Sequence, residues 1–425
     1  MFYLETGMKS HCYGCRACEH VCPLDCIDML EDNEGFRYPS KNDARCADCG
    51  HCRSVCPNAQ APFLLANGNT HQPRGFMAIH RDECIRESSS SGGAFSAIVE
   101  AFCNHDGEFA IFGAEFDDHF KVVHSYAESV AATERFRKSK YVQSDTQDSY
   151  VKARRFLREG RRVLFTGTPC QIAGLRLYLG REYENLLTVD LVCHGVPSSK
   201  VFSKYLTYLR HRFGGPVLSF TFRYKTCNRW GKWNSRNVKV DFGSRHVIMD
   251  SQTDLYLQAF HAGLFYRPSC YECRFATPRR ISDITLADFW GLERVDKEEQ
   301  VHKGVSALLI NTPKGEFLLD DLSRYMRLVE VDSAIIVEGN SQLQHPVRLH
   351  PFRQRFFQQL NSTDDFRKAV SACIPTIHKL KWRALALLGP RGRSMAKRIL
   401  QRIRKQKHTV LSSVQNSARR GRPLR

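Results

Sequence analysis

The sequence predicts two folded units of different class, a small α+β unit at the N-terminus and a larger α/β unit with a mixed sheet behind it. Three observations predict this division. Nine of the 17 cysteines lie between Cys12 and Cys56. From Phe76 onward, short apolar runs alternate with amphipathic stretches, which is the pattern of strands followed by helices. A chain of 425 residues with 42% hydrophobic residues is also long enough for two or three domains with buried cores.

The N-terminal unit contains a repeated cysteine pattern. The spacing C-x2-C-x2-C-x3-C-P begins once at Cys12 and again at Cys46. Bacterial ferredoxins with two 4Fe-4S clusters have this spacing, and the fourth cysteine of each string binds the other cluster. We therefore predict a ferredoxin-like domain over residues 1–62. Its expected ligands are Cys12, Cys15, Cys18 and Cys56 for one cluster, and Cys46, Cys49, Cys52 and Cys22 for the other.

The alternatives for these cysteines fit the sequence less well. A pair of zinc ribbons would use separated C-x2-C pairs rather than runs of three cysteines closed by Cys-Pro. Disulfides suit exported proteins, but the N-terminus has no basic segment followed by an apolar one, and no apolar run approaches the roughly 20 residues of a membrane span. We thus expect a reducing, cytoplasmic location. Cys26, which lies outside the pattern, is expected to pack in the core rather than to bind metal.

Beyond an expected linker over residues 63–75, strand-turn-helix units predict an α/β domain over residues 76–335. One such unit spans residues 162–179 and another spans residues 186–211, where Ser198 is a favoured residue for capping a helix N-terminus. Further elements make the expected sheet mixed. These are a hairpin around Gly243 and strands over residues 282–289 and 305–311.

Four cysteines of the large unit are candidates for a further site. Cys170 and Cys193 each follow a predicted strand end, where α/β folds gather ligands. Cys270 and Cys273 form a C-x2-C clamp that could close over them. The alternative is that the first two are buried free thiols and the last two are half of a zinc site. The residues alone leave both interpretations open. The other cysteines lack spacing partners and are expected to be structural, namely Cys84, Cys103, Cys227 and Cys373.

A run of serines and glycines over residues 88–93 precedes an apolar helix that begins near Phe95. Its backbone N–H groups and hydroxyls could cradle a pyrophosphate at the helix N-terminus, although such runs are usually plain loops. Lys140 could neutralise a phosphate or stabilise an anionic ring, or it could be a solvated surface lysine. His194 is able to relay a proton, and a structural histidine in a turn is equally consistent with the sequence. We therefore assign no catalytic residue.

Five strings of the large unit together resemble the beta subunit family of coenzyme F420 hydrogenases and dehydrogenases. The resemblance covers roughly residues 8–330, includes the segment 282–291, and is of the type with a fused ferredoxin domain. Relatives of this type accompany polysaccharide biosynthesis proteins in bacteria. The strings are Ser88-Ser-Ser-Ser-Gly-Gly93, Ser139-Lys-Tyr141, Gly167-Thr-Pro-Cys-Gln171, Cys193-His-Gly195 and Ser269-Cys-Tyr-Glu-Cys273.

This resemblance implies a cofactor set for the large domain. In that family the domain binds FAD and an additional 4Fe-4S cluster. The implied ligands of this third cluster are Cys170, Cys193, Cys270 and Cys273. The implied FAD-binding residues are Ser90, Ser91, Gly92, Gly93, Lys140, Thr168, Pro169 and Gln171.

The positive charge of the chain belongs to its C-terminal part. The formal net charge is +19, and residues 378–425 contain fifteen Lys or Arg without any Asp or Glu, which leaves a net charge of +4 for the rest. We divide this part into an extension over residues 336–377 and a basic tail over residues 378–425. A basic amphipathic helix in the tail would suit an anionic membrane surface, such as the inner face of the membrane, or an acidic partner, and a disordered solubilising tail is the alternative. No nucleic-acid-binding motif accompanies the charge, so nucleic acid is not expected.

These observations predict an iron-sulfur flavoprotein oxidoreductase. FAD would exchange electrons with a soluble small-molecule substrate or coenzyme F420, and the clusters would pass single electrons to a ferredoxin or another redox partner protein. The alternative is a non-catalytic electron-transfer subunit that relays electrons to a partner enzyme. The fold does not determine the substrate.

Overall fold

The computed structural model describes residues 1–66, 72–227, 233–295 and 303–374. The basic tail over residues 378–425 and its expected helix therefore lie outside the described residues. No helix within the described ranges combines the length and the apolar character that crossing a membrane requires.

The N-terminal domain is a small α+β unit, as predicted. Its two cysteine strings fold alike, because each leads through a left-handed residue, Arg16 (φ 62°) or Gly50 (φ 75°), into a short helix. Strands β1 and β2 form an antiparallel hairpin that pairs Ile27 with Lys41. The elements are α1 (Tyr3–Thr6), η1 (Lys9–His11), α2 (Ala17–His20), β1 (Ile27–Glu31), β2 (Arg37–Lys41), α3 (His51–Ser54) and α4 (Pro57–Ala66).

The connection to the large domain is shorter than the expected linker over residues 63–75. Helix α4 continues to Ala66, and strand β3 (Arg74–His80) begins immediately after the segment 72–73. Pro62 lies inside α4. A composition rich in Pro, Asn, Gly and Gln favoured a linker. Packing of Pro57 and Ala61 in the domain core instead continues the helix into this region.

The large domain is built on the predicted mixed sheet. Eight strands lie in the order β13-β3-β12-β11-β7-β6-β4-β5. The central strands β4, β6, β7 and β11 are parallel, and the strands at both sides are antiparallel to their neighbours. The bounds are β3 (Arg74–His80), β4 (Phe109–Phe116), β5 (Val122–Ala127), β6 (Arg162–Gly167), β7 (Leu186–Leu191), β11 (Ile284–Asp288), β12 (Ser306–Ile310) and β13 (Met326–Val331).

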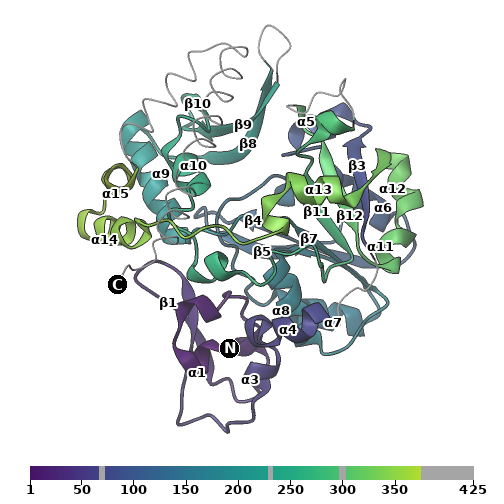
Figure 1. Cartoon of the computed structure of the whole chain (residues 1–425), viewed down its shortest axis with the longest axis horizontal. Coiled ribbons are helices and arrows are strands. Elements are labelled where there is room, and N and C mark those ends of the chain that lie inside the picture. Colours follow the sequence, from purple (N-terminus) through teal and green to yellow (C-terminus); the bar gives the residue numbers. More distant parts are fainter. Residues whose placement is uncertain (67–71, 228–232, 296–302, 375–425) are drawn as a thin grey trace, which may run out of the picture.

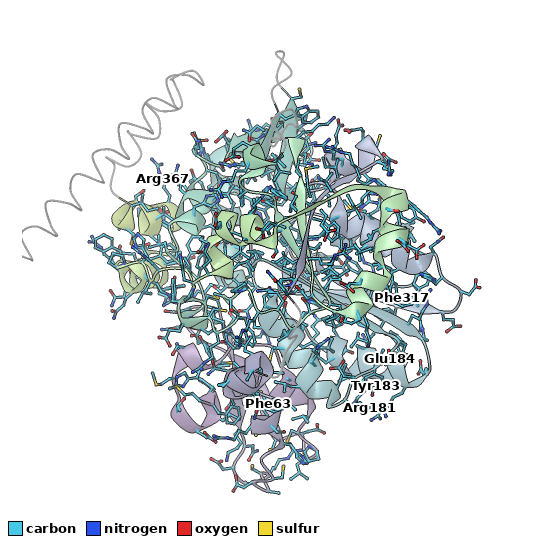
Figure 2. All side chains as sticks on the ribbon, turned by 45° about the vertical axis from the view of Figure 1, so that its right-hand side comes forward. Phe63, Arg181, Tyr183, Glu184, Phe317 and Arg367 are labelled. Carbon is cyan, nitrogen blue, oxygen red and sulfur yellow. The ribbon has the colours of Figure 1, made fainter. Side chains whose placement is uncertain are left out.

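Helices cover both faces of this sheet (Figure 1). Because strand side chains alternate, Val163 and Phe165 of β6 pack with α7 (Ser149–Arg158) and α8 (Pro169–Leu179), while Leu164 packs on the opposite face. That face is covered by α6 (Ala94–Cys103) and α12 (Leu319–Tyr325). The shorter segments of the domain are α5 (Glu83–Ser88), η2 (Ala131–Phe136), η3 (Pro268–Glu272), η4 (Leu292–Arg294) and α11 (Pro313–Phe317). Phe63 of α4 and Phe317 of α11 project from the surface (Figure 2).

The expected hairpin around Gly243 forms, but it belongs to a separate sheet. Strands β8 (Ser219–Cys227), β9 (Trp233–Asp241) and β10 (His246–Asp250) lie in the order β10-β9-β8. An aromatic core packs this sheet against four helices, and Tyr205, Tyr256 and Phe366 contact one another within it. The helices are α9 (Ser199–Phe213), α10 (Leu255–His261), α14 (Arg353–Thr363) and α15 (Phe366–Cys373). Ser198 caps α9 as predicted, accepting from the backbone N–H of Val201.

The C-terminal extension binds the large domain to the N-terminal domain. After α13 (Ser333–Gly339) and η6 (Ser341–Leu343), the chain crosses to α14, where Arg353 forms two hydrogen bonds of 2.9 and 2.6 Å to the Glu34 carboxylate. The Ser198 hydroxyl donates to the Glu34 carbonyl oxygen at 2.6 Å. Both the extension and the large domain therefore hold the N-terminal domain at Glu34.

Candidate functional site

The first thiol set, Cys12, Cys15, Cys18 and Cys56, lies inside the N-terminal domain where it meets the large domain. Burial, followed by the neighbouring thiols of Cys15, Cys12 and Cys56, raises the pKa of Cys18 well above its ordinary value. Burial also raises the pKa of Cys15 to about 12, with Cys56 and Cys12 adding to the effect. The thiols of both strings thus meet here, as the two-cluster pattern predicts.

The second thiol set, Cys22, Cys46, Cys49 and Cys52, is the more exposed of the two sets in the N-terminal domain. Burial is the main cause that raises the pKa of Cys52, and Cys46 and Cys49 add to it. Cys49 is exposed, in contrast to the buried Cys12 and Cys15 of the first set. The two sets therefore differ in access to solvent. A partner protein can reach the second set directly.

The third thiol set consists of the four cysteines of the large domain, Cys170, Cys193, Cys270 and Cys273. Cys170 lies in the first turn of α8, Cys193 follows β7, and the other two belong to η3 or follow it directly. Burial raises the pKa of Cys170 well above its ordinary value, and the thiols of Cys273, Cys193 and Cys270 raise it further. The fold thus brings together four thiols that come from three separate parts of the chain.

One backbone arrangement recurs in all three sets. Two residues after the cysteine, a residue with a left-handed backbone donates its N–H to the cysteine Sγ. The donors are Gly14 (φ 71°) to Cys12 at 3.3 Å, Asp48 (φ 48°) to Cys46 at 3.4 Å, and Gly195 (φ 109°) to Cys193 at 3.4 Å. Hydrogen bonds to sulfur stabilise thiolates and tune cluster potentials. The residues present therefore fit thiolate-bound clusters.

Within the described ranges, no three His, Cys, Asp or Glu side chains converge on a position for a single metal ion. A 4Fe-4S cluster makes a different demand, because each of its four thiolates binds a separate iron atom and the sulfurs stand around the cluster rather than around one ion. Three groups of four neighbouring thiols meet that demand.

The first and third thiol sets are neighbours across helix α8. Cys170 occupies its first turn, and Gly174, one turn later, faces the first set so closely that an added Cβ would lie 3.0 Å from the Cys15 Sγ. One turn advances about 5.4 Å along the helix axis. Tyr13 is buried beside them and lines the same cavity as Cys170 and Cys273. Burial raises the pKa of Tyr13 well above its ordinary value, and Cys273 and Cys170 add to this effect. The two sets are therefore separated by one helical turn and one aromatic side chain.

Arg267, which is only 1% exposed, contacts a cysteine of each of these two sets. Its guanidinium donates to the Cys12 carbonyl oxygen at 2.7 Å and to the Cys12 Sγ at 3.3 Å. Its own carbonyl oxygen accepts the N–H of Cys270 at 2.9 Å. Sequence reasoning missed Arg267, because a lone arginine between Tyr266 and Pro268 carries no spacing signal. Its positive charge lies next to both thiol sets and stabilises negative charge on their sulfurs.

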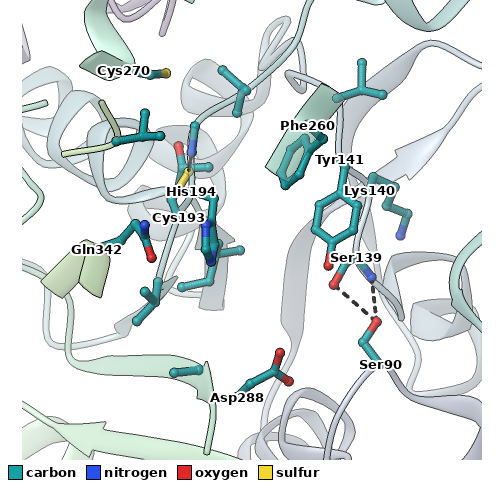
Figure 3. A pocket seen from close by; sticks show the side chains of 18 of the residues that line it. Ser90, Ser139, Lys140, Tyr141, Cys193, His194, Phe260, Cys270, Asp288 and Gln342 are labelled. Carbon is teal, nitrogen blue, oxygen red and sulfur yellow. Dashed lines mark hydrogen bonds between the residues drawn. The ribbon is translucent and has the colours of Figure 1, made fainter. Parts of the chain in front are cut away.

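A cavity of about 1180 Å³ opens beside the third thiol set. All four of these cysteines line it, together with residues from β7, α8, α10 and the extension. The volume exceeds the roughly 300–1,000 Å³ of pockets for drug-sized ligands. Figure 3 shows Cys193 and His194 on one side of the cavity, with Tyr141 and Lys140 across from them. A ligand of dinucleotide size therefore has room next to the thiols.

The cavity wall favours anions. Lys140 donates to the carbonyl oxygens of Arg135 and Arg137 at 2.9 and 2.8 Å, and desolvation lowers its pKa to about 7. Arg223 is paired with Asp288 at 2.6 Å, and Arg236 lies nearby with its charge over the Trp290 ring. The N-termini of α6 and α8 also line the cavity, and helix N-termini carry partial positive charge.

Seven of the eight residues predicted to bind FAD line this cavity, namely Ser90, Ser91, Gly93, Lys140, Thr168, Pro169 and Gln171. Gly92 does not. Its N–H donates to the Ser306 hydroxyl at 2.9 Å, and an added Cβ would lie 2.3 Å from the Ala78 carbonyl oxygen. Gly92 therefore allows its loop to pack closely against strands β3 and β12. The Ser90 hydroxyl accepts from the backbone N–H of Ser139 at 2.8 Å, which fixes the two predicted strings to each other (Figure 3).

His194 lies on the cavity wall, 6.5 Å from the Phe260 ring between centroids. Burial lowers its pKa, so its imidazole is neutral at pH 7. Sequence reasoning missed Arg223 and Arg236. They come from β8 and β9 of the separate sheet, and no local sequence pattern predicts that this sheet packs over the cavity.

Two family models match parts of this chain. Residues 11–59 match the model of a 4Fe-4S dicluster domain, and residues 160–334 match the model for the C terminus of the coenzyme F420 hydrogenase/dehydrogenase beta subunit. Among solved structures, a chain of the F420-reducing [NiFe] hydrogenase complex from Methanosarcina barkeri is 15% identical, with 72% of this chain and 92% of that chain covered and a TM-score of 0.41. Curated proteins give no match.

Proposed function

We propose that this chain, in which a 4Fe-4S dicluster domain precedes a domain of the coenzyme F420 hydrogenase/dehydrogenase beta subunit family, is an iron-sulfur flavoprotein oxidoreductase. Its two N-terminal clusters exchange single electrons with a ferredoxin or another redox partner protein. A third cluster, held by Cys170, Cys193, Cys270 and Cys273, connects them to FAD in the cavity.

The observation that carries this proposal is the order of the three thiol sets. The second set contains the exposed Cys49, the first set contains the buried Cys12 and Cys15, and the third set lines the cavity. One turn of α8 separates the last two sets. The same N–H to sulfur contact occurs at Cys12, Cys46 and Cys193, which supports one kind of cofactor in all three sets.

FAD suits the cavity through its size and its charge. The pyrophosphate of FAD would lie near the N-terminus of α6, Ser90 and Lys140, and Thr168 and Gln171 at the start of α8 would border the ring. Bound flavin supplies the conversion between two-electron and one-electron chemistry. The protein groups contribute positive charge, exclusion of water by the aromatic wall of Tyr141 and Phe260, and a neutral imidazole at His194 that is able to accept a proton at a ring nitrogen.

The remaining space in the cavity suits a soluble small-molecule substrate, and we include coenzyme F420 among the candidates. Residues of the extension, Gln342 and His350, border the same cavity as His194. A substrate that enters there meets Arg223 and Arg236 near the cavity wall. An anionic or polar substrate is therefore favoured over an apolar one.

The exposure of the second thiol set also supports a second candidate function, a relay subunit without a substrate of its own. In that case electrons would pass from the cavity to a partner enzyme rather than to a soluble substrate. The two functions differ in one measurement. An oxidoreductase turns over an added acceptor as a purified chain, whereas a relay subunit does so only with its partner.

The first experiment is anaerobic purification and reconstitution with iron and sulfide, followed by measurement of iron, acid-labile sulfide, zinc and released flavin per chain. We expect about twelve iron atoms and about one FAD. About eight iron atoms without flavin would overturn the flavoprotein proposal and leave a ferredoxin-type relay. Zinc in place of iron would overturn both.

A further inference from the structure

A fifth thiol lies beside the second thiol set. Cys26 is 3% exposed, and its Sγ lies 3.3 Å from the Cys22 Sγ. The backbone N–H of Cys26 donates to that same sulfur at 3.4 Å. Its carbonyl oxygen accepts the N–H of Asn42 at 2.8 Å, which fixes the backbone at the start of β1. Cys26 is therefore buried, as predicted, and in addition its sulfur faces that of Cys22 in a defined conformation.

Cys26 also faces the other cysteine string. The Cys46 thiol is also near enough to raise the pKa of Cys26, although Cys22 has the larger effect. Cys22 and Cys46 come from different strings, and the two-cluster pattern assigns both to the same cluster. A thiol that contacts Cys22 and lies near Cys46 is placed at the edge of that cluster site.

The internal repeat supplies a comparison within the same molecule. Cys26 follows Cys22 in the way that Gln60 follows Cys56, the fourth cysteine of the other string. Gln60 lies in α4, and its side-chain amide is 3.5 Å from the Arg53 carbonyl oxygen. The first thiol set thus has no sulfur at the position that Cys26 occupies. The surplus thiol is specific to the second set, the more exposed of the two.

We propose that Cys26 is a reserve ligand of the second cluster and is able to take the place of Cys22. This inference rests on the proposed presence of that cluster. In the exchange, the bond between iron and the Cys22 Sγ breaks and a bond between the same iron and the Cys26 Sγ forms. The proton of the Cys26 thiol passes to the released Cys22 thiolate, so no electron is gained or lost. The outer cluster thereby survives loss of one of its four ligands.

The test compares serine variants at matched positions of the repeat. We expect Cys22→Ser and Cys26→Ser each to keep the full iron content of the unmodified protein, and the double variant to lose about four iron atoms. Cys56→Ser is the matched control, and we expect it to lose about four iron atoms by itself, since Gln60 offers no replacement. Iron and labile sulfide are measured after anaerobic reconstitution, and the reduced clusters are counted by electron paramagnetic resonance.

Loss of about four iron atoms from Cys22→Ser alone would overturn the proposal, because Cys26 would then be unable to serve as a ligand. Loss from Cys26→Ser alone would also overturn it, since Cys26 would be the required ligand rather than the reserve. Absence of iron from the unmodified protein would instead refute the proposed function.

A second measurement does not depend on how Cys22→Ser folds. Cys26→Ser replaces sulfur by oxygen at a position where no ligand is lost. We expect it to change the resonance signal of one cluster at constant iron content, because a hydrogen-bonding group next to the Cys22 sulfur has changed. Gln60→Ala should leave all signals unchanged. An unaltered spectrum of Cys26→Ser would contradict the assignment.

Discussion

The cysteines of the N-terminal domain and those of the large domain reach similar arrangements by different routes. The predicted N-terminal ligands come from two compact strings, and a short helix within each string sets their geometry. The third thiol set is collected from α8, the end of β7 and η3, so its geometry depends on the packing of the whole sheet. Local sequence determines the first kind of site, and topology determines the second. The two should therefore respond differently to the same substitution.

The largest contrast is expected from removing one ligand of each kind. Cys49→Ala should lower the iron content by about four atoms and leave the large domain folded, because the second thiol set belongs to the N-terminal domain and Cys49 is exposed. Cys273→Ala should also cost about four iron atoms, together with a fall in the unfolding temperature, since the third set joins separate elements. Iron analysis and circular dichroism during heating measure both effects. Unchanged iron in either variant would refute the corresponding ligand assignment.

A smaller but more selective effect is expected at the junction between the two kinds of site. In Gly174→Val, the added Cβ would lie 3.0 Å from both the Cys15 Sγ and the Tyr150 hydroxyl oxygen. Overpacking of this size costs about 1–3 kcal/mol and should displace the first thiol set from α8. We expect loss of about one cluster and slow reduction of flavin by the remaining ones, measured by stopped-flow absorbance. Full iron content with unchanged flavin reduction would show that this contact is not needed.

Arg267→Gln probes the charge that lies between the first and third thiol sets. The substitution removes the donor to the Cys12 Sγ and leaves buried acceptors without partners, which should lower the free energy of unfolding by about 1–3 kcal/mol. Loss of a positive charge next to the cluster disfavours the added electron, so its reduction potential should fall. Redox titration followed by electron paramagnetic resonance measures the shift.

The control for Arg267→Gln is Lys9→Gln. Lys9 is another cation near Tyr38, but its ammonium is exposed to solvent and pairs with Asp32. Solvent screens such a charge, so its removal should leave the potential almost unchanged. Equal shifts in the two variants would contradict a specific role for Arg267.

The smallest expected effect is a pH dependence of flavin binding. Desolvation lowers the pKa of Lys140 from its ordinary value of 10.5 to about 7, so the free protein loses this positive charge as the pH rises through about 7. Affinity for the anionic FAD should fall by up to about tenfold per pH unit above that point, because binding must then recover the proton. Titration calorimetry with the iron-loaded, flavin-free protein at several pH values measures this slope.

Two variants decide whether Lys140 causes that slope. Lys140→Met should weaken binding at pH 6 and flatten the pH profile. Lys225→Met is the matched control, because desolvation also lowers the pKa of Lys225 to about 7, while its ammonium donates to the Arg86 and Ser91 carbonyl oxygens. The profile of the control should keep its slope. A slope retained in Lys140→Met would assign the effect to another group.

Local patterns predicted much of this molecule. The repeat from Cys12 and Cys46, the strand-turn-helix unit that ends in the α8 helix, and the cap at Ser198 all depend on neighbours in sequence, and the structure contains each of them. The mixed sheet was also predicted. These features follow from spacing, periodicity and capping, which act over a few residues.

The remaining features depend on contacts between distant segments. The hairpin at Gly243 could be predicted, but its membership of a separate sheet over the cavity could not, since aromatic packing with α9 and α15 decides it. The contact of Gly174 with Cys15 and the position of Arg267 arise only when the N-terminal domain docks on the large one. Cys26 is buried, as the prediction of core packing requires, but its contact with the Cys22 thiol appears only in three dimensions.

The anchoring of Glu34 has a consequence for the rate of electron flow. Arg353 of the extension and Ser198 of the large domain both bind this residue, and the Thr146 hydroxyl donates to the Cys15 carbonyl oxygen at 3.0 Å. The distance between the first and third thiol sets is therefore fixed by the folded structure rather than by a domain that swings between two positions. Exchange within the molecule should then be independent of solvent viscosity, and only the encounter with a partner at the exposed set should slow down as viscosity rises.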